Sequence, residues 1–127
     1  MTEDGTATSS QGPRRQDYLD VVRLNRLYGD KPSVLQAMQQ EYAKRSRELL
    51  ETLRSAEQSL DYHALEEAAH ALKGNSSLIG ALRVESLAQD IQAAARNREE
   101  QAIRAGLQEL EPALERTITL LEDFLHG

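Results

Sequence analysis

The segment 70–81 reads HALKGNSSLIGA and follows an apolar lead-in that begins at Leu65. On a helical wheel of about 100° per residue, Leu72 and Ile79 fall within about 40° of Leu65, so these residues form a core-facing side. His70 falls at about 140° from Leu65, on the opposite side. The segment therefore predicts a helix that buries leucine on one face and exposes a histidine on the other.

The exposed side of this helix groups His70 with Lys73, Gly74 and Ser77. Glycine inside a helix costs about 1 kcal/mol relative to alanine, so Gly74 needs a reason. It lies one turn after His70, where it leaves the imidazole uncovered and lets another protein approach. Lys73 can place a cation beside the ring. A neutral imidazole is a nucleophile, and a nearby cation stabilises a phosphoryl group, so the four residues predict a phosphoryl acceptor.

The rest of the chain predicts an all-α fold. From Asp17 onward the apolar residues follow a helical period, and no stretch shows sustained strand-like alternation. We expect helices at about 17–28, 32–59, 62–79, 84–97 and 99–124. Long amphipathic helices joined by short connectors are typical of an antiparallel four-helix bundle, here with a short additional N-terminal helix that caps one end.

Individual residues set the expected helix boundaries. Gly29 should end the first helix, and Pro32 suits the first turn of the second. Asp61 is a good N-cap for the helix that carries His70, and Gly80 is a suitable residue to end it. Pro112 falls inside the last helix, where it should cause a kink or the loss of hydrogen bonds.

Composition narrows the class of protein. The 127 residues fit one domain, which we place at 17–127, and the polar segment 1–16 is expected to be a disordered tail or linker. There is no cysteine, which excludes disulfides and thiolate chemistry. The net charge of −6 argues against nucleic acid and anionic membranes as partners. No apolar run approaches the ~20 residues of a membrane span, and we expect a cytoplasmic protein.

The segment 70–81 resembles the signature of the histidine-containing phosphotransfer (HPt) domain, His-x-Leu-Lys-Gly-x-Ser-x-x-x-Gly-Ala, with every fixed position present. The lead-in from Asp61 is also similar, and the order of the helices extends the likeness over about residues 17–124. The resemblance implies a bundle that accepts a phosphoryl group from a receiver-domain aspartyl-phosphate and passes it to another receiver in a two-component phosphorelay. It implies a phosphorelay carrier without ATP-dependent kinase activity.

The resemblance also implies a role for each matching residue. His70 corresponds to the phosphorylated histidine, Lys73 to the lysine that neutralises the phosphoryl group, and Gly74 to the glycine that gives clearance. Gln92 stands where many members have a Gln or Glu that orients the ring. Gly74 and Ser77 should lie in the surface that docks the partner.

The partners expected from the resemblance are receiver domains, one in a hybrid sensor kinase and one in a downstream regulator. Mg²⁺ is expected on the receiver, so we predict no metal site and no cofactor in this chain. We also expect a monomer.

Three other classes compete with this interpretation. In the dimerisation helices of histidine kinases an acidic residue usually follows the histidine, whereas Ala71 follows here, and no ATP-binding domain is present. A metal-binding bundle would need more ligands than the pair Glu67 and His70, and His63 lies about 10 Å from His70 along the axis. A helical adaptor that docks a signalling partner without phosphotransfer remains an alternative.

Overall fold

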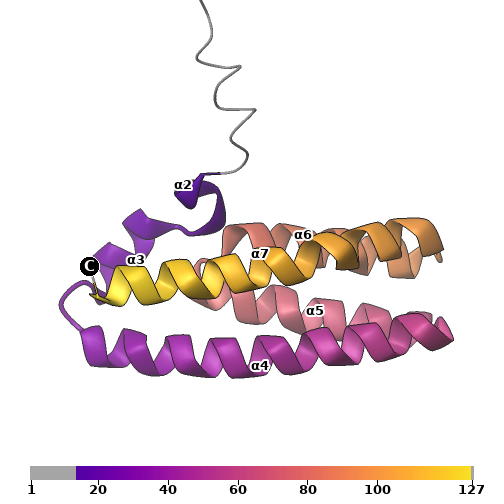
Figure 1. Cartoon of the computed structure of the whole chain (residues 1–127), viewed down its shortest axis with the longest axis horizontal. Coiled ribbons are helices and arrows are strands. Elements are labelled where there is room, and N and C mark those ends of the chain that lie inside the picture. Colours follow the sequence, from indigo (N-terminus) through magenta and orange to yellow (C-terminus); the bar gives the residue numbers. More distant parts are fainter. Residues whose placement is uncertain (1–13, 127) are drawn as a thin grey trace, which may run out of the picture.

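The structure is a computed structural model that describes residues 14–126 (Figure 1). Its helices are α2 (Arg15–Tyr18), α3 (Val21–Tyr28), α4 (Pro32–Ser59), α5 (Tyr62–Ile79), α6 (Leu82–Arg96) and α7 (Glu100–His126). Helices α4 to α7 run alternately up and down as a four-helix bundle, and α2 and α3 lie over the end where α4 begins and α7 ends. The predicted all-α bundle is confirmed.

One continuous apolar core holds the four long helices together. Each of them buries large side chains completely, and burial of a Leu or Ile is worth about 1.5–3 kcal/mol. The largest fully buried side chains are Leu19, Leu24, Leu35, Leu53, Leu65, Leu72, Ile79, Ile91, Ile103, Leu110, Leu114 and Leu121. No helix in the described part of the chain is long and apolar enough to cross a membrane.

The predicted first helix at 17–28 is wrong in one respect, because it is divided into α2 and α3. Leu19 adopts an extended conformation (φ −129°, ψ 140°) and pairs with Ala81 in an isolated antiparallel bridge. Asp20 then caps α3, since its carboxylate accepts a hydrogen bond from the Arg23 backbone N–H at 3.1 Å. The bridge fixes Leu19 in the core, and the Asp20 cap starts a new helix.

The predicted tail at 1–16 lies mostly outside the described residues, which begin at Arg14. Arg15 and Gln16 belong to α2.

The other boundaries follow the predicted signals. Pro32 is the first residue of α4, and Asp61 caps α5 by accepting from the Ala64 backbone N–H at 3.1 Å. Gly80 ends α5 in the left-handed conformation (φ 72°), which glycine adopts without strain. Helix α7 continues through Pro112, which has no N–H to donate to the preceding turn but does not end the helix. The proline is exposed at the surface of the bundle.

Two polar contacts lock α5 against α4. The hydroxyl groups of Tyr42 and Ser76 lie 3.0 Å apart in the core, and Asn75 Nδ2 donates to Ser46 Oγ at 3.0 Å. Burial raises the pKa of Tyr42 to about 12, against the smaller lowering effect of its hydrogen bonds, so the phenol stays protonated and can donate. Buried polar groups need partners of defined geometry, so these contacts fix the rotation of α5 about its own axis.

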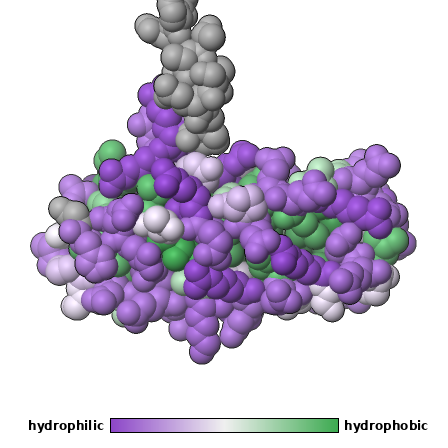
Figure 2. Space-filling view, in the orientation of Figure 1, coloured by the Kyte–Doolittle hydropathy of each residue, from purple (hydrophilic) through white to green (hydrophobic). Residues whose placement is uncertain are grey.

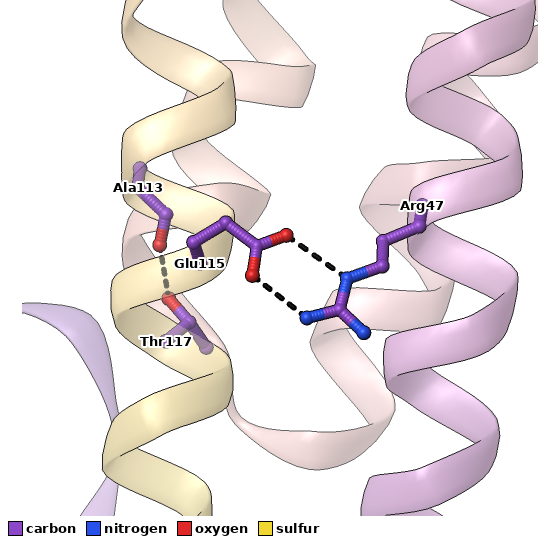
Figure 3. A network of polar contacts seen from close by, with 4 residues as sticks. All are labelled: Arg47, Ala113, Glu115 and Thr117. Carbon is purple, nitrogen blue, oxygen red and sulfur yellow. Dashed lines mark hydrogen bonds and ion pairs between the residues drawn. The ribbon is translucent and has the colours of Figure 1, made fainter.

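Ion pairs cover the seam between α4 and α7. Arg47 donates to both carboxylate oxygens of Glu115 at 2.9 and 2.7 Å, beside the Thr117 hydroxyl, which donates to the Ala113 carbonyl oxygen at 2.8 Å (Figure 3). Over α4 and α7 the surface is mostly hydrophilic (Figure 2). This face of the bundle is a solvated one.

Candidate functional site

The outer side of α5 presents His70 and Gly74 to solvent, because the opposite side is anchored in the core. Leu65 and Leu72 are completely buried, and both His70 and Gly74 are exposed. A Cβ atom added at Gly74 would have no neighbouring atom within 4 Å. The glycine is therefore not required by packing inside this chain, and the space beside it is open to another molecule.

Helix α6 supplies a polar partner for the imidazole. Gln92 is half-buried, and its Nε2 lies 3.3 Å from His70 Nδ1. The amide can present its nitrogen or, after a half-turn, its oxygen to the ring. With the oxygen, Gln92 accepts from Nδ1–H and holds the tautomer in which Nε2 carries the free lone pair. That tautomer is the one that makes Nε2 a nucleophile.

The contact between Gln92 and His70 is one of two successive links between α5 and α6. One turn away, Arg96 donates to Glu66 Oε2 from Nε at 2.9 Å and lies 2.8 Å from the same oxygen through Nη2. Because both links join the same sides of the two helices, Gln92 is held at the level of the imidazole. The ring is thus positioned by a neighbouring helix as well as by its own.

Lys73 and Ser77 complete the group of residues predicted from the sequence. Lys73 is half-buried and makes no ion pair with another described residue, whereas Ser77 is exposed. The backbone oxygen of Ser77 accepts a hydrogen bond from Arg23 Nη1 of α3 at 3.0 Å. The structure therefore brings together all the predicted site residues, four on α5 and Gln92 on α6. Their chemical roles stay predictions.

Several residues of segment 70–81 stabilise the fold and do not belong to the exposed face. Ser76 is buried against Tyr42, Gly80 takes the left-handed conformation that ends α5, and Ala81 is completely buried beside Leu19. Sequence reasoning missed the contact of Tyr42 with Ser76. A tyrosine on an apolar stripe needs a partner for its hydroxyl, and that need was the available signal.

The histidine nearest to the site, His63, has a different environment. Its Nε2 lies 3.3 Å from Glu67 Oε2, and both side chains are well exposed. Within residues 14–126 no group of three or more His, Cys, Asp or Glu side chains is arranged to hold a metal ion.

Comparison with known proteins identifies the family. A sequence model of the Hpt domain matches residues 37–124, which is more than half of the chain. The chain belongs to the Hpt domain family. It is a histidine phosphotransfer protein of the phosphorelay type, and the adaptor alternative is not favoured. Hpt domains interact with receiver domains, which are thus the class of partner.

A solved structure has the same fold as this chain. The histidine-containing phosphotransfer protein B (HptB) from Pseudomonas aeruginosa PAO1 superposes with a TM-score of 0.75 and 24% sequence identity. The match covers 89% of this chain and 97% of the HptB chain. A comparison with curated proteins finds no match.

Proposed function

We propose that His70 is the residue of this Hpt protein that accepts the phosphoryl group from a receiver-domain aspartyl-phosphate. The contact of Gln92 with His70 Nδ1 is the observation that carries the proposal, because the amide, turned so that its oxygen accepts from Nδ1–H, reserves Nε2 for attack. The exposure of the ring and the open space at Gly74 support it further, since the phosphorus must approach Nε2 in line.

The proposed step is a reversible transfer of one phosphoryl group. The Nε2 lone pair of neutral His70 forms the N–P bond while the P–O bond to the receiver aspartate breaks, and the electron pair of that bond leaves with the aspartate carboxylate. The proton on Nδ1 stays in place, held by Gln92. Transfer to a second receiver follows the same course in reverse, with its aspartate as the nucleophile.

Three other groups assist this step in the proposal. Lys73 stabilises the negative oxygens of the phosphoryl group once it is on the ring, because it lies one turn from His70 and has no acidic partner among the described residues. Gly74 lets the receiver backbone come close, and Ser77 lies in the same contact area. Mg²⁺ and most of the remaining charge stabilisation come with the receiver.

We further propose that the donor is the receiver of a hybrid sensor kinase and that the acceptor belongs to a downstream regulator. In this proposal the protein works as a cytoplasmic monomer and needs neither nucleic acid nor a membrane. The net charge of −6 supports the last point.

Phosphotransfer profiling tests the proposed function. Each receiver domain of the source organism, phosphorylated with a radioactive label, is mixed with this protein, and the acid-labile label is mapped by mass spectrometry. We expect label on His70 alone. His63 and His126 are internal controls, because both are histidines outside the proposed site. Label on either of them, or a receiver that binds without transferring label, would contradict the proposal.

A further inference from the structure

Segment 73–78 of α5 has no large buried apolar side chain to hold it on the bundle. Leu72, just before it, is completely buried, and Ile79, just after it, is buried as well. Within the described segment 73–78, Ser76 is the only buried residue, and its side chain is small and polar. Gly74 lies in the same segment, and glycine is a poor helix former. The segment therefore depends on other contacts to keep its place.

Helix α4 supplies these contacts through polar side chains. Tyr42 and Ser46, one turn apart on α4, meet the consecutive residues Asn75 and Ser76 of α5, and the four residues are called the polar cluster below. The hydroxyl oxygen of Tyr42 lies 3.0 Å from Ser76 Oγ, and Asn75 Nδ2 donates to Ser46 Oγ at 3.0 Å. Tyr42, Ser46 and Ser76 are at most 2% exposed. Buried hydrogen bonds are directional and meet little competition from water, so the polar cluster holds segment 73–78 in one position.

A second link to this segment is weaker. Arg23 of α3 donates to the Ser77 carbonyl oxygen at 3.0 Å, and this bond is exposed to solvent. Water competes with exposed hydrogen bonds, so the buried polar cluster is the stronger constraint.

The position of segment 73–78 matters for the site because the segment carries Lys73, Gly74 and Ser77. Lys73 lies in the turn directly after His70. A shift of the segment would therefore change the distance from the Lys73 ammonium to a phosphoryl group on the ring. It would also move the backbone at Gly74, where the space beside the imidazole is open.

We propose that the polar cluster positions segment 73–78 for phosphotransfer, by holding α5 firmly where Gly74 weakens the helix. Its four members are positioning residues, because they act through the backbone of α5 and keep Lys73 and Gly74 in place relative to His70. The inference rests on the proposed function, since these positions affect a reaction only if His70 accepts the phosphoryl group.

Hydrogen exchange of backbone amides, measured by NMR, is the first test. The double variant Tyr42→Phe with Ser76→Ala removes one hydrogen bond of the polar cluster and leaves neither partner unpaired. Thr117→Val is the matched control, because it removes a buried hydroxyl hydrogen bond within α7. We expect exchange in segment 73–78 to accelerate at least tenfold relative to segment 65–72 in the double variant, and to keep its original ratio in the control.

The rate of phosphotransfer at saturating phosphorylated receiver is the second readout, at a temperature where melting curves show every variant fully folded. We expect the double variant to accept the phosphoryl group at least fivefold more slowly than the unaltered protein, and Thr117→Val to stay within twofold. A purely structural role would leave the rate per folded molecule unchanged. Equal rates in the double variant and the control would overturn the proposal.

A stronger helix at the glycine should rescue the double variant. Gly74→Ala adds a methyl group that meets no atom within 4 Å, and alanine is the best helix former. We expect exchange in segment 73–78 to return to within twofold of its original rate. Exchange that alanine does not slow would overturn the proposal, because the polar cluster would then not compensate for the glycine. Absence of label on His70 in the unaltered protein, with the exchange pattern as expected, would instead contradict the proposed function.

Discussion

The two broad faces of the bundle differ in how many of their charged residues form ion pairs within the chain. Between α4 and α7, arginines pair with glutamates across the seam, as in Arg47 with Glu115 and Arg54 with Glu111. On the side formed by α5 and α6, Lys73 has no acidic partner among residues 14–126, and His70 contacts the neutral amide of Gln92. The first face pairs several of its charges across the seam, whereas the second, although Arg96 pairs with Glu66 there, leaves a cation and an imidazole available.

The two faces also differ in their apolar groups. The view over α4 and α7 is mostly hydrophilic (Figure 2), while Leu78 and Leu82 stand exposed on α5 and α6. Polar groups that form no ion pair within the chain, beside exposed apolar side chains, are typical of a surface that a protein partner covers. We therefore expect the partner to bind the α5–α6 face and the α4–α7 face to stay in contact with solvent, and substitutions on each face test that division.

The largest effect is expected from His70→Gln, which removes the nucleophile from the α5–α6 face. Label from a phosphorylated receiver should be lost completely, because glutamine offers no nitrogen that forms a stable N–P bond. The melting temperature should be nearly unchanged, since the ring is exposed. Circular dichroism and radiolabelling on the same sample check both points. A folded variant that still takes up label would remove His70 from the proposed role.

Gly74→Gln should separate function from stability. The long side chain fills the open space beside His70, so we expect transfer from the receiver to fall about 100-fold through displacement of the partner. Stability should rise by up to about 1 kcal/mol, because glycine is a poor helix former. Quenched time courses of phosphotransfer measure the change in rate, and urea titration measures the change in stability. Unchanged transfer would show that no partner approaches Gly74.

Leu72→Ala should show the reverse pattern. Leu72 is completely buried on the core side of α5, so its truncation should reduce the free energy of unfolding by about 2–5 kcal/mol. Below the unfolding transition the labelling rate per folded molecule should stay within about threefold of the original, because the exposed face is intact. A labelling loss as large as that of Gly74→Gln would mean that the two sides of α5 are not independent.

Lys73→Ala should reduce the transfer rate or the lifetime of phosphorylated His70 by about tenfold, which corresponds to the ~1.4 kcal/mol of one charge-assisted hydrogen bond. Lys44→Ala is the matched control, because Lys44 is an exposed lysine on α4. Both variants change the net charge equally, so a general electrostatic effect would alter them alike. Equal behaviour of the two variants would exclude a local role for Lys73.

Arg47→Ala should have the smallest effect, because it alters the solvated α4–α7 face. The hydrogen bonds from Arg47 lower the pKa of Glu115, so the pair stabilises the protein above the ordinary glutamate pKa of 4.5. That contribution is lost as the pH falls through the lower folded-state pKa of Glu115. Solvent and salt screen the exposed pair, and we expect about 0.5 kcal/mol at neutral pH.

Urea titrations of Arg47→Ala at pH 7 and at pH 3 measure this difference, which should shrink at the lower pH. Phosphotransfer should be unaffected at pH 7. A loss of transfer would show that a substitution on the α4–α7 face affects the α5–α6 face, which would contradict the division between the two faces.

Local signals made most of the fold and the position of the site predictable. The caps at Asp61 and Gly80 and the core side of α5 depend on residues that are neighbours in the chain, so periodicity and residue type are sufficient. The division of the first helix depends on Ala81, which lies far along the chain from Leu19. The contact of Tyr42 with Ser76 is equally non-local: the apolar stripe indicates that the Tyr42 hydroxyl needs a partner, but no local pattern identifies Ser76 as that partner.

The open position of His70 has a practical consequence for the phosphorylated protein. A phosphoryl group adds about −1.5 to −2 charges at neutral pH, and on a ring without a cover these charges face the bulk solvent. The unmodified chain already carries −6. The phosphorylated molecules should therefore be retained longer on an anion-exchange column. Chromatography at neutral pH should resolve phosphorylated from unphosphorylated protein and measure the phosphorylated fraction directly.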